Sequence, residues 1–323
     1  MRYEREYNDV TMINRRQFLM TGGAATFAAG CTMDNAGRGL RPHGVTSFRP
    51  RFHVFSKMFQ SPVTKSPEEL CDLMTGAGYD GIQWTVRKGG HATPENVKTE
   101  LPRLVKMCEA RGLKVETICT GITDGNDLCA ETICRVAADC GIGQFRTGYY
   151  FYDEKNETFL QSMDRFRRAF ESLADLGRRC GIKAAYQNHS TWGPAIFGGA
   201  VWDIYECVKD LDPRYIGIEF DPMHAYFENY ESWRHGFARV APWISSIDLK
   251  DFHYALSKKD PKRMEKKMVA AGDGVAPWTE TKRLIGQLNV DPLYIVHFEY
   301  DFDKTNLPKT VKDELDAFKR LFA

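Results

Sequence analysis

A regular alternation of short apolar runs and longer amphipathic stretches constrains this chain most, and it repeats eight times after residue 50. The short runs are rich in β-branched and aromatic residues, as strands are, while glycine follows several of the longer stretches, as it does at helix ends. Strands that are separated by a helix each time predict a parallel sheet with right-handed crossovers. The expected strands are 51–55, 81–86, 114–119, 144–147, 183–188, 215–220, 245–250 and 293–298, and the expected helices are 67–77, 94–111, 127–140, 157–180, 199–211, 231–241, 278–288 and 309–322.

Eight strand–helix units in one region predict an α/β protein with a single (β/α)8 TIM barrel over residues 51–323. Such barrels commonly take about 250 residues. A doubly wound open sheet is the alternative, but no Gly-x-Gly-x-x-Gly sequence follows the first expected strand. The charged run 258–267 is expected to be a solvated loop between two units.

The N-terminal region has the pattern of an export signal. Arg15 and Arg16 are followed by Phe18-Leu19 and by a Gly- and Ala-rich stretch over 21–30, which resembles a twin-arginine signal that the export machinery reads. We therefore expect the protein to be exported, as a periplasmic protein or a membrane-anchored lipoprotein. The expected organisation is a signal over 1–31, a flexible linker over 32–50 and the barrel over 51–323.

A lipid anchor is a separate expectation for the same region. Residues 28–31, Ala-Ala-Gly-Cys, resemble a lipoprotein cleavage box in which the thiol of Cys31 is acylated. Ala28 stands where the box usually has a larger aliphatic residue, so acylation of Cys31 and its absence both stay open. No run of about 18 apolar residues is present, which argues against a conventional membrane span.

The charge balance excludes one class of partner. The chain has 44 Lys and Arg against 43 Asp and Glu, for a net charge of +1. Nucleic-acid-binding proteins normally concentrate a basic excess, so we expect no nucleic-acid partner.

Polar side chains gather where the expected strands end. In barrels of this kind the reactive groups lie at the carboxyl ends of the strands, where the strand-to-helix loops converge. Carboxylates or amides follow four successive strands, which is the ligand chemistry that a divalent cation needs. The residues at these ends are Trp84, Arg146, Gln187, Asn188, His189, Asp221, His224, Asp248, Lys250 and Glu299.

These motifs carry a resemblance to a known family. Their order along the chain resembles the xylose-isomerase-like sugar isomerase/epimerase superfamily over residues 51–323. The resemblance implies the barrel fold and a Mn²⁺, Mg²⁺, Co²⁺ or Zn²⁺ ion, held by a Glu, an Asp, a His and a Glu on strands five to eight. It also implies that the two glutamates move a proton of the substrate. The motifs are Tyr-Gln-Asn-His at 186–189, Asp-Pro-Met-His at 221–224, Leu-Lys-Asp at 249–251, Gly-Asp-Gly at 272–274 and Phe-Glu at 298–299.

Two of the four implied metal ligands match the family pattern and two depart from it. Asp221 and Glu299 match, whereas Gln187 stands in place of the first glutamate and Asp248 in place of the histidine. Both substitutes have oxygen atoms that can bind a divalent cation. Gln187 cannot act as a general base, however, because an amide does not titrate. A symmetrical reaction between two glutamates is therefore not expected.

The remaining chemistry predicts Glu299 as the base that removes a proton α to a sugar carbonyl. The cation and Lys250 would stabilise the enediolate, and His189, His224 or Lys250 would supply a proton. Isomerisation, epimerisation and β-elimination from a 3-keto-glycoside all begin with this step and stay open, as does a barrel that only binds carbohydrate. The expected substrate-binding residues are Arg146, Trp84 and Asn188.

Overall fold

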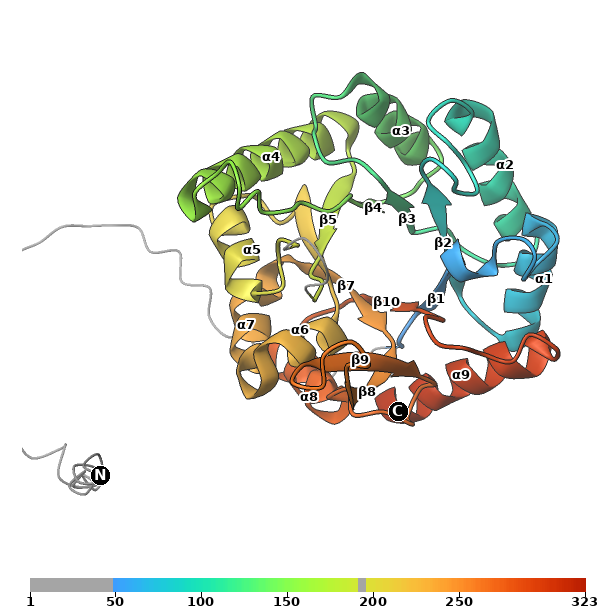
Figure 1. The fold of residues 1–323 in the computed structure, drawn as a ribbon. Helices are drawn as coiled ribbons and strands as arrows, with labels where there is room; N and C mark the ends of the chain where they lie inside the picture. The colour runs from blue at the N-terminus through green and yellow to red at the C-terminus, as the bar shows by residue number, and fades with distance from the viewer. Residues whose placement is uncertain (1–48, 191–195) are drawn as a thin grey trace, which may run out of the picture. The chain divides into compact units, whose positions relative to one another are not determined.

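A computed structural model describes residues 49–190 and 196–323, so the predicted signal over 1–31 and most of the predicted linker lie outside the described residues. Eight parallel strands close into a barrel in the order β1-β10-β7-β6-β5-β4-β3-β2 (Figure 1). The predicted (β/α)8 barrel is therefore confirmed. The barrel strands are β1 (Phe52–Phe55), β2 (Gly81–Val86), β3 (Thr117–Thr120), β4 (Gln144–Arg146), β5 (Lys183–Gln187), β6 (Ile216–Phe220), β7 (Ile244–Leu249) and β10 (Leu293–Val296).

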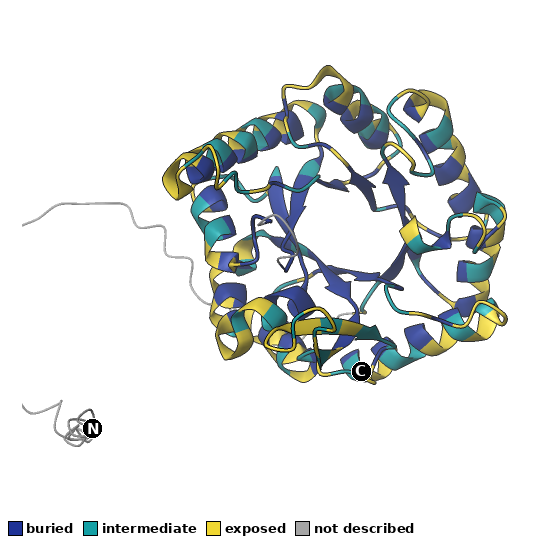
Figure 2. Ribbon diagram, in the orientation of Figure 1, coloured by how far each residue is buried: buried dark blue, intermediate teal, exposed yellow. Residues whose placement is uncertain are grey.

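Helices surround the barrel and bury one face each. Figure 2 shows buried residues along the strands and on the inward sides of the helices, with exposed residues on the outside. Short 3-10 helices extend some of the connections: η1 (Ser56–Phe59), η2 (Tyr230–Ser232) and η3 (Ala241–Trp243). The helices are α1 (Pro67–Ala77), α2 (Val97–Glu109), α3 (Leu128–Asp139), α4 (Phe159–Cys180), α5 (Val201–Val208), α6 (Pro222–Asn229), α7 (Trp233–Val240), α8 (Trp278–Leu288) and α9 (Leu307–Phe322).

Local capping explains where several helices begin and end. Thr158 and Gln161 form a reciprocal capping box at the start of α4, and Gly181 ends that helix at a φ of 69°. The predicted start of the second helix at Pro94 is three residues early. Asn96 instead precedes α2, and its side chain accepts a hydrogen bond from the backbone N–H of Thr93.

The sequence-based prediction missed a two-stranded antiparallel sheet between β7 and α8. β8 (Asp251–Leu256) pairs with β9 (Met264–Val269), so the C-terminal part of the run predicted as a solvated loop is a strand. Four of the six residues of β9 are charged or exposed, and no apolar alternation marks the strand in the sequence. Its pairing with β8 is what makes it a strand.

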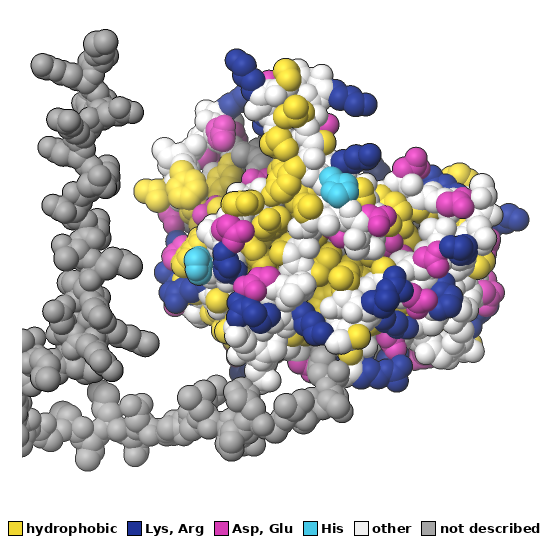
Figure 3. All heavy atoms as spheres, turned by 90° about the horizontal axis from the view of Figure 1, so that it is seen from below, with side chains coloured by type: hydrophobic (Ala, Val, Ile, Leu, Met, Phe, Trp, Pro, Cys, Tyr) yellow, Lys and Arg dark blue, Asp and Glu magenta, His cyan; other side chains and the backbone are white. Residues whose placement is uncertain are grey.

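The surface carries both signs of charge. On the face in Figure 3, basic and acidic side chains are interspersed around hydrophobic ones. Within residues 49–190 and 196–323, no helix has the length and apolar character that crossing a membrane requires.

Candidate active site at the barrel mouth

Side-chain alternation along the strands places polar residues inside the barrel at two depths. Residues two apart on a strand face the same side, so Glu219 and Asp221 both point inward. We call Gln187, Asp221, Lys250 and Glu299, at the carboxyl ends of the strands, the mouth layer. Gln83, Arg146 and Glu219 form the deep layer, and Asp248 and His297 connect the two layers.

Lys250 is the centre of the mouth layer. Its Nζ lies 3.0 Å from Oδ2 of Asp221 and 3.1 Å from Oε2 of Glu299. The side chains of Lys250 and Asp221 are 1% and 0% exposed, whereas that of Glu299 is 27% exposed. Glu299 is therefore the member of this ion-pair cluster that a ligand at the mouth can reach.

The ion pairs decide which of these groups are charged. Burial lowers the pKa of Lys250, but the charges of Asp221 and Glu299 outweigh it and the net pKa is raised. Burial likewise opposes ionisation of Glu299, yet the charge of Lys250 and the hydrogen bond from His297 hold its pKa well below the usual value. Burial raises the pKa of Asp221 to about 6 despite Lys250. Lys250 and Glu299 are thus both ionised at neutral pH.

Asp221 is fixed by its backbone as well as by its charge. Its carboxylate caps α6 by accepting a hydrogen bond from the backbone N–H of His224 at 3.0 Å. The Asn188 side chain donates to the carbonyl of Asp221 at 2.9 Å and accepts from its backbone N–H at 2.7 Å. Asn188, predicted to bind substrate, is 1% exposed and joins the ends of β5 and β6. The contacts of its side chain are with the Asp221 backbone, and its contact with substrate stays a prediction.

Gln187 uses both ends of its amide inside the site. Its Oε1 accepts a hydrogen bond from the hydroxyl of Tyr149. Its Nε2 donates to Oδ2 of Asp221 at 3.4 Å and to Oδ2 of Asp248. Gln187 therefore acts as a hydrogen-bonding link between neighbouring strands.

In the deep layer an arginine faces one carboxylate. Nη1 of Arg146 lies 3.3 Å from Oε1 of Glu219, and Nε2 of Gln83 donates to Oε2 of Glu219 at 2.9 Å. The guanidinium also lies 4.7 Å from the ring centroid of Phe55. Burial raises the pKa of Glu219 to about 8. Arg146 was predicted to bind substrate, but it is 4% exposed and its partner is Glu219.

The sequence analysis missed Glu219 on β6 and His297 directly after β10, which lie two residues before the predicted site residues Asp221 and Glu299. His297 Nε2 is 3.2 Å from Oδ1 of Asp248, and its Nδ1 is 3.1 Å from Oε1 of Glu299. Glu219, Asp248 and His297 each offer an atom within 4.8 Å of the others, so this buried triad could hold a metal ion. The two-residue period of a strand was the signal that could have found both residues.

The four residues predicted to bind a divalent cation lie together, but they do not fit one as they are arranged. The ammonium of Lys250 lies against Asp221 and Glu299 at hydrogen-bonding distance. Gln187 directs its N–H groups at Asp221 and Asp248, and the hydroxyl of Tyr149 meets its oxygen. Oxygen atoms that a metal would need are thus bound to donors from the protein.

His189 and His224 lie beside the mouth layer with their ring centroids 3.7 Å apart. Nδ1 of His224 is 2.7 Å from Oγ of Ser190, to which Lys266 of β9 also donates a hydrogen bond. Burial lowers the pKa of His189 to about 2 and that of His224 well below its usual value. Both imidazoles are therefore neutral at pH 7, and neither has an imidazolium proton to give.

Trp84, predicted to bind substrate, faces away from the barrel interior. It is 0% exposed, and its Nε1 donates to Sγ of Cys108 on α2 at 3.4 Å. The alternation along β2 turns Gln83 inward and Trp84 toward the helix. The sequence analysis recognised the strand end but not the direction of the Trp84 side chain, and its contact with substrate stays a prediction.

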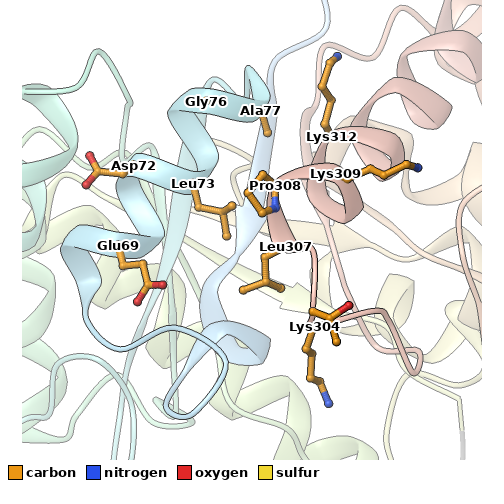
Figure 4. A pocket seen from close by; sticks show the side chains of 11 residues that line it. Glu69, Asp72, Leu73, Gly76, Ala77, Lys304, Leu307, Pro308, Lys309 and Lys312 are labelled. Atoms are coloured by element: carbon orange, nitrogen blue, oxygen red, sulfur yellow. The ribbon is translucent and has the colours of Figure 1, made fainter.

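A separate groove lies between α1 and the start of α9, with a volume of about 770 Å³ (Figure 4). Leu73 and Leu307 contribute apolar surface, and acidic side chains from α1 and lysines from the α9 segment surround it. None of the residues that line it belongs to the mouth layer or the deep layer.

Comparison with known families supports the fold. The xylose isomerase-like TIM barrel family matches residues 71–321. The chain belongs to this family. A search of the curated proteins finds no match to this chain.

Several solved structures share the fold of this chain at low sequence identity. D-psicose 3-epimerase from Clostridium cellulolyticum H10, crystallised with D-tagatose, has a TM-score of 0.63 and 9% identity, covering 84% of this chain and 99% of that one. The 3-keto-D-glucoside 4-epimerase of E. coli has a TM-score of 0.61 and 12% identity, covering 84% and 99%. A xylose isomerase-like barrel protein from Mycobacterium smegmatis, in complex with magnesium, has a TM-score of 0.59 and 14% identity, covering 86% and 98%.

Proposed function

We propose that this protein is an enzyme that transfers a proton at the carbon next to a carbohydrate carbonyl, as sugar isomerases and epimerases do. One observation carries the proposal: the partly exposed carboxylate of Glu299 lies beside the buried ammonium of Lys250 at the barrel mouth, with Nζ and Oε2 3.1 Å apart. The fold neighbours include epimerases of a ketose and of a 3-keto-glucoside, which supports a carbohydrate as substrate.

The two groups have complementary tasks. Glu299 removes the proton from the carbon, and the electron pair moves onto the carbonyl oxygen. Lys250 donates a hydrogen bond to that oxygen as negative charge develops on it. As negative charge develops on the substrate oxygen, it competes with Glu299 for the charge of the ammonium, which raises the pKa of the carboxylate and makes it a stronger base.

The presence of one base distinguishes among the reactions. Epimerisation requires a proton on the opposite face of the carbon, and the first of the family's two glutamates is replaced by Gln187, which does not titrate. Isomerisation can use one carboxylate that returns the proton to a neighbouring carbon on the same face. We therefore favour isomerisation of an aldose or ketose over epimerisation.

A lyase that acts on 3-keto-glycosides is the second candidate, and Lys266 supports it. β-Elimination needs one base and an acid for the leaving oxygen. Lys266 reaches Ser190 from β9, and burial lowers the pKa of its ammonium, which makes it a better proton donor. Lys266→Met should slow elimination and leave α-proton exchange intact.

Exchange in deuterated water tests the proposal. The protein would be incubated with a set of ketoses, aldoses and 3-keto-glycosides, and NMR would follow deuterium entering the carbon next to the carbonyl. Exchange with an isomeric product supports isomerisation, and release of an alcohol with an unsaturated ketone supports the lyase. Sugar binding without exchange in any of them would instead identify a carbohydrate-binding barrel.

We also propose that this reaction takes place outside the cytoplasm, because residues 1–31 carry the twin-arginine pattern. Arg15→Lys together with Arg16→Lys should retain the precursor in the cytoplasm. Cys31→Ser should remove a lipid anchor if the thiol is acylated, which a shift from the membrane to the soluble periplasmic fraction would reveal. Normal export of the double-lysine variant would refute the twin-arginine assignment.

A further inference from the structure

We infer that Lys250 supplies the cation of this site, so that its ammonium takes the place and the task of the divalent metal ion that the family resemblance implies. The inference rests on the proposed function, and it deepens that function by naming the electrophile. Its first support is the position of the group. Nζ lies between Asp221 and Glu299, the two residues that match the family's ligand pattern, at 3.0 and 3.1 Å.

The second support is the change in donor chemistry around that position. A metal site would use the Gln187 oxygen and the Asp248 carboxylate, but the Gln187 amide faces Asp248 with its N–H group. The oxygen of Gln187 accepts from Tyr149. Gln187 and Asp248, which depart from the family pattern, therefore form hydrogen bonds with other groups of the protein.

The third support is electrostatic. A divalent cation binds oxygen at about 2.0 to 2.6 Å. An ion bound to Asp221 and Glu299 at such distances would lie only a few ångströms from Nζ, in a place that water hardly reaches, since Lys250 is 1% exposed. Two positive charges on the ion and one on the ammonium would repel strongly there. Binding the ion would require Lys250 to leave.

The position of Lys250 is fixed before any substrate arrives. It follows directly after β7, and alternation directs it inward with Asp248. Asp221 in turn is fixed by Asn188 and by the start of α6. An ammonium has three N–H groups, and among the described residues two are directed at Asp221 and Glu299. The third can donate to the carbonyl oxygen of a substrate without rearrangement of the site.

Titration of the metal-free full-length protein with Mn²⁺ tests this inference. Calorimetry and the EPR signal of free Mn²⁺ would compare the wild type, Lys250→Met, and Lys250→Met combined with Asp221→Asn. The wild type should have no Mn²⁺ site that depends on Asp221. Lys250→Met should gain a Mn²⁺ site at the mouth. Its affinity should be at least about tenfold higher than any binding of the wild type there, equivalent to about 1.4 kcal/mol, and the added Asp221→Asn should remove it.

Glu219→Gln is the matched control for the deeper triad. Binding to the wild type that survives Asp221→Asn but disappears with Glu219→Gln belongs to that triad and supports the inference, because the mouth layer has not bound the ion. Wild-type binding that Asp221→Asn abolishes would overturn it. A folded Lys250→Met variant that gains no site would overturn it as well.

If Lys250→Met does not fold, the wild type and Asp221→Asn decide alone, since Mn²⁺ binding that depends on Asp221 either occurs or does not. The readout is metal binding, so it is separate from turnover. If the protein binds no Mn²⁺ at the mouth and also fails to exchange sugar protons, the proposed function is refuted. The inference that no metal binds at the mouth would still hold.

Discussion

The two layers inside the barrel use the same chemistry in different surroundings. In the deep layer Arg146 faces Glu219, and both side chains are closed off from solvent. In the mouth layer Lys250 faces Asp221 and Glu299, and the carboxylate of Glu299 is 27% exposed. A buried cation with carboxylate partners therefore does not by itself mark an active site. Because one of its carboxylates is accessible, we assign the proposed chemistry to the mouth layer and a structural role to the deep layer.

The largest expected effect is on Glu299. Glu299→Gln keeps the shape of the side chain and removes the base, so turnover should fall roughly 10³-fold, within the range of general-base contributions. The melting temperature should change by only a few degrees, because the side chain is partly exposed and Lys250 keeps Asp221 as a partner. Steady-state kinetics and thermal unfolding check both parts. Loss of folding in place of loss of turnover would assign Glu299 to structure.

Arg146→Met tests the deep layer, where we expect a loss of stability in place of a loss of turnover. At pH 9, above the pKa of about 8 that burial gives Glu219, the substitution leaves this carboxylate buried and ionised without its cation, which should cost about 3 kcal/mol of unfolding free energy. Urea denaturation measures the loss. The double variant Arg146→Met with Glu219→Gln should recover most of it, because no uncompensated charge remains. A double variant as unstable as the single one would contradict this view of the deep layer.

Asn188→Ala tests whether this residue positions Asp221 or binds substrate. It removes two hydrogen bonds to the buried backbone of Asp221, so we expect a loss of about 1 to 3 kcal/mol in stability. The KM for the sugar should change little, since the Asn188 side chain faces the protein. A large rise in KM with unchanged stability would instead support the predicted role of Asn188 in substrate binding.

The most gradual expected effect, a slope of stability with pH, concerns a buried carboxyl outside both layers. Burial raises the pKa of Glu314 to about 7, and its partners are the Tyr300 hydroxyl at 2.8 Å and the backbone N–H of Ala271 at 3.2 Å. The folded state therefore holds a proton between pH 4.5 and 7 that the unfolded state has lost. Stability should fall as the pH rises through this window, by at most about 1.4 kcal/mol per pH unit from this group.

Glu314→Gln isolates that contribution. The variant should lose this part of the slope, and the difference between wild-type and variant unfolding free energies, measured from pH 4 to pH 8, should show it. An unchanged slope would mean that Glu314 stays ionised in the folded state.

The sequence predicted the barrel and its mouth well because both depend on local patterns. The eight units follow from alternating runs and from helix-ending glycines such as Gly78 and Gly181. Gln187, Asp221, Asp248 and Glu299 were found because a parallel barrel brings strand ends together. That these residues lie in one cluster around Lys250 follows from the same rule.

What the sequence did not predict depends on side-chain direction and on long-range pairing. Trp84 and Gln83 are neighbours on β2, and only the position of the strand in the barrel decides which one points inward. Glu219 and His297 lie within the barrel interior, below the strand ends that guided the prediction. The β8–β9 pair brings Lys266 to Ser190, a contact across 76 residues that no local pattern indicates.

A crystal structure of the Glu299→Gln variant with bound substrate, a ketose or a 3-keto-glycoside that the deuterium experiment identifies, tests the central claim most directly. We expect the carbonyl oxygen within hydrogen-bonding distance of Nζ of Lys250, and the carbon that loses its proton facing the side chain at position 299. A sugar bound with its carbonyl away from Lys250, or in another groove such as the one between α1 and α9, would contradict the account.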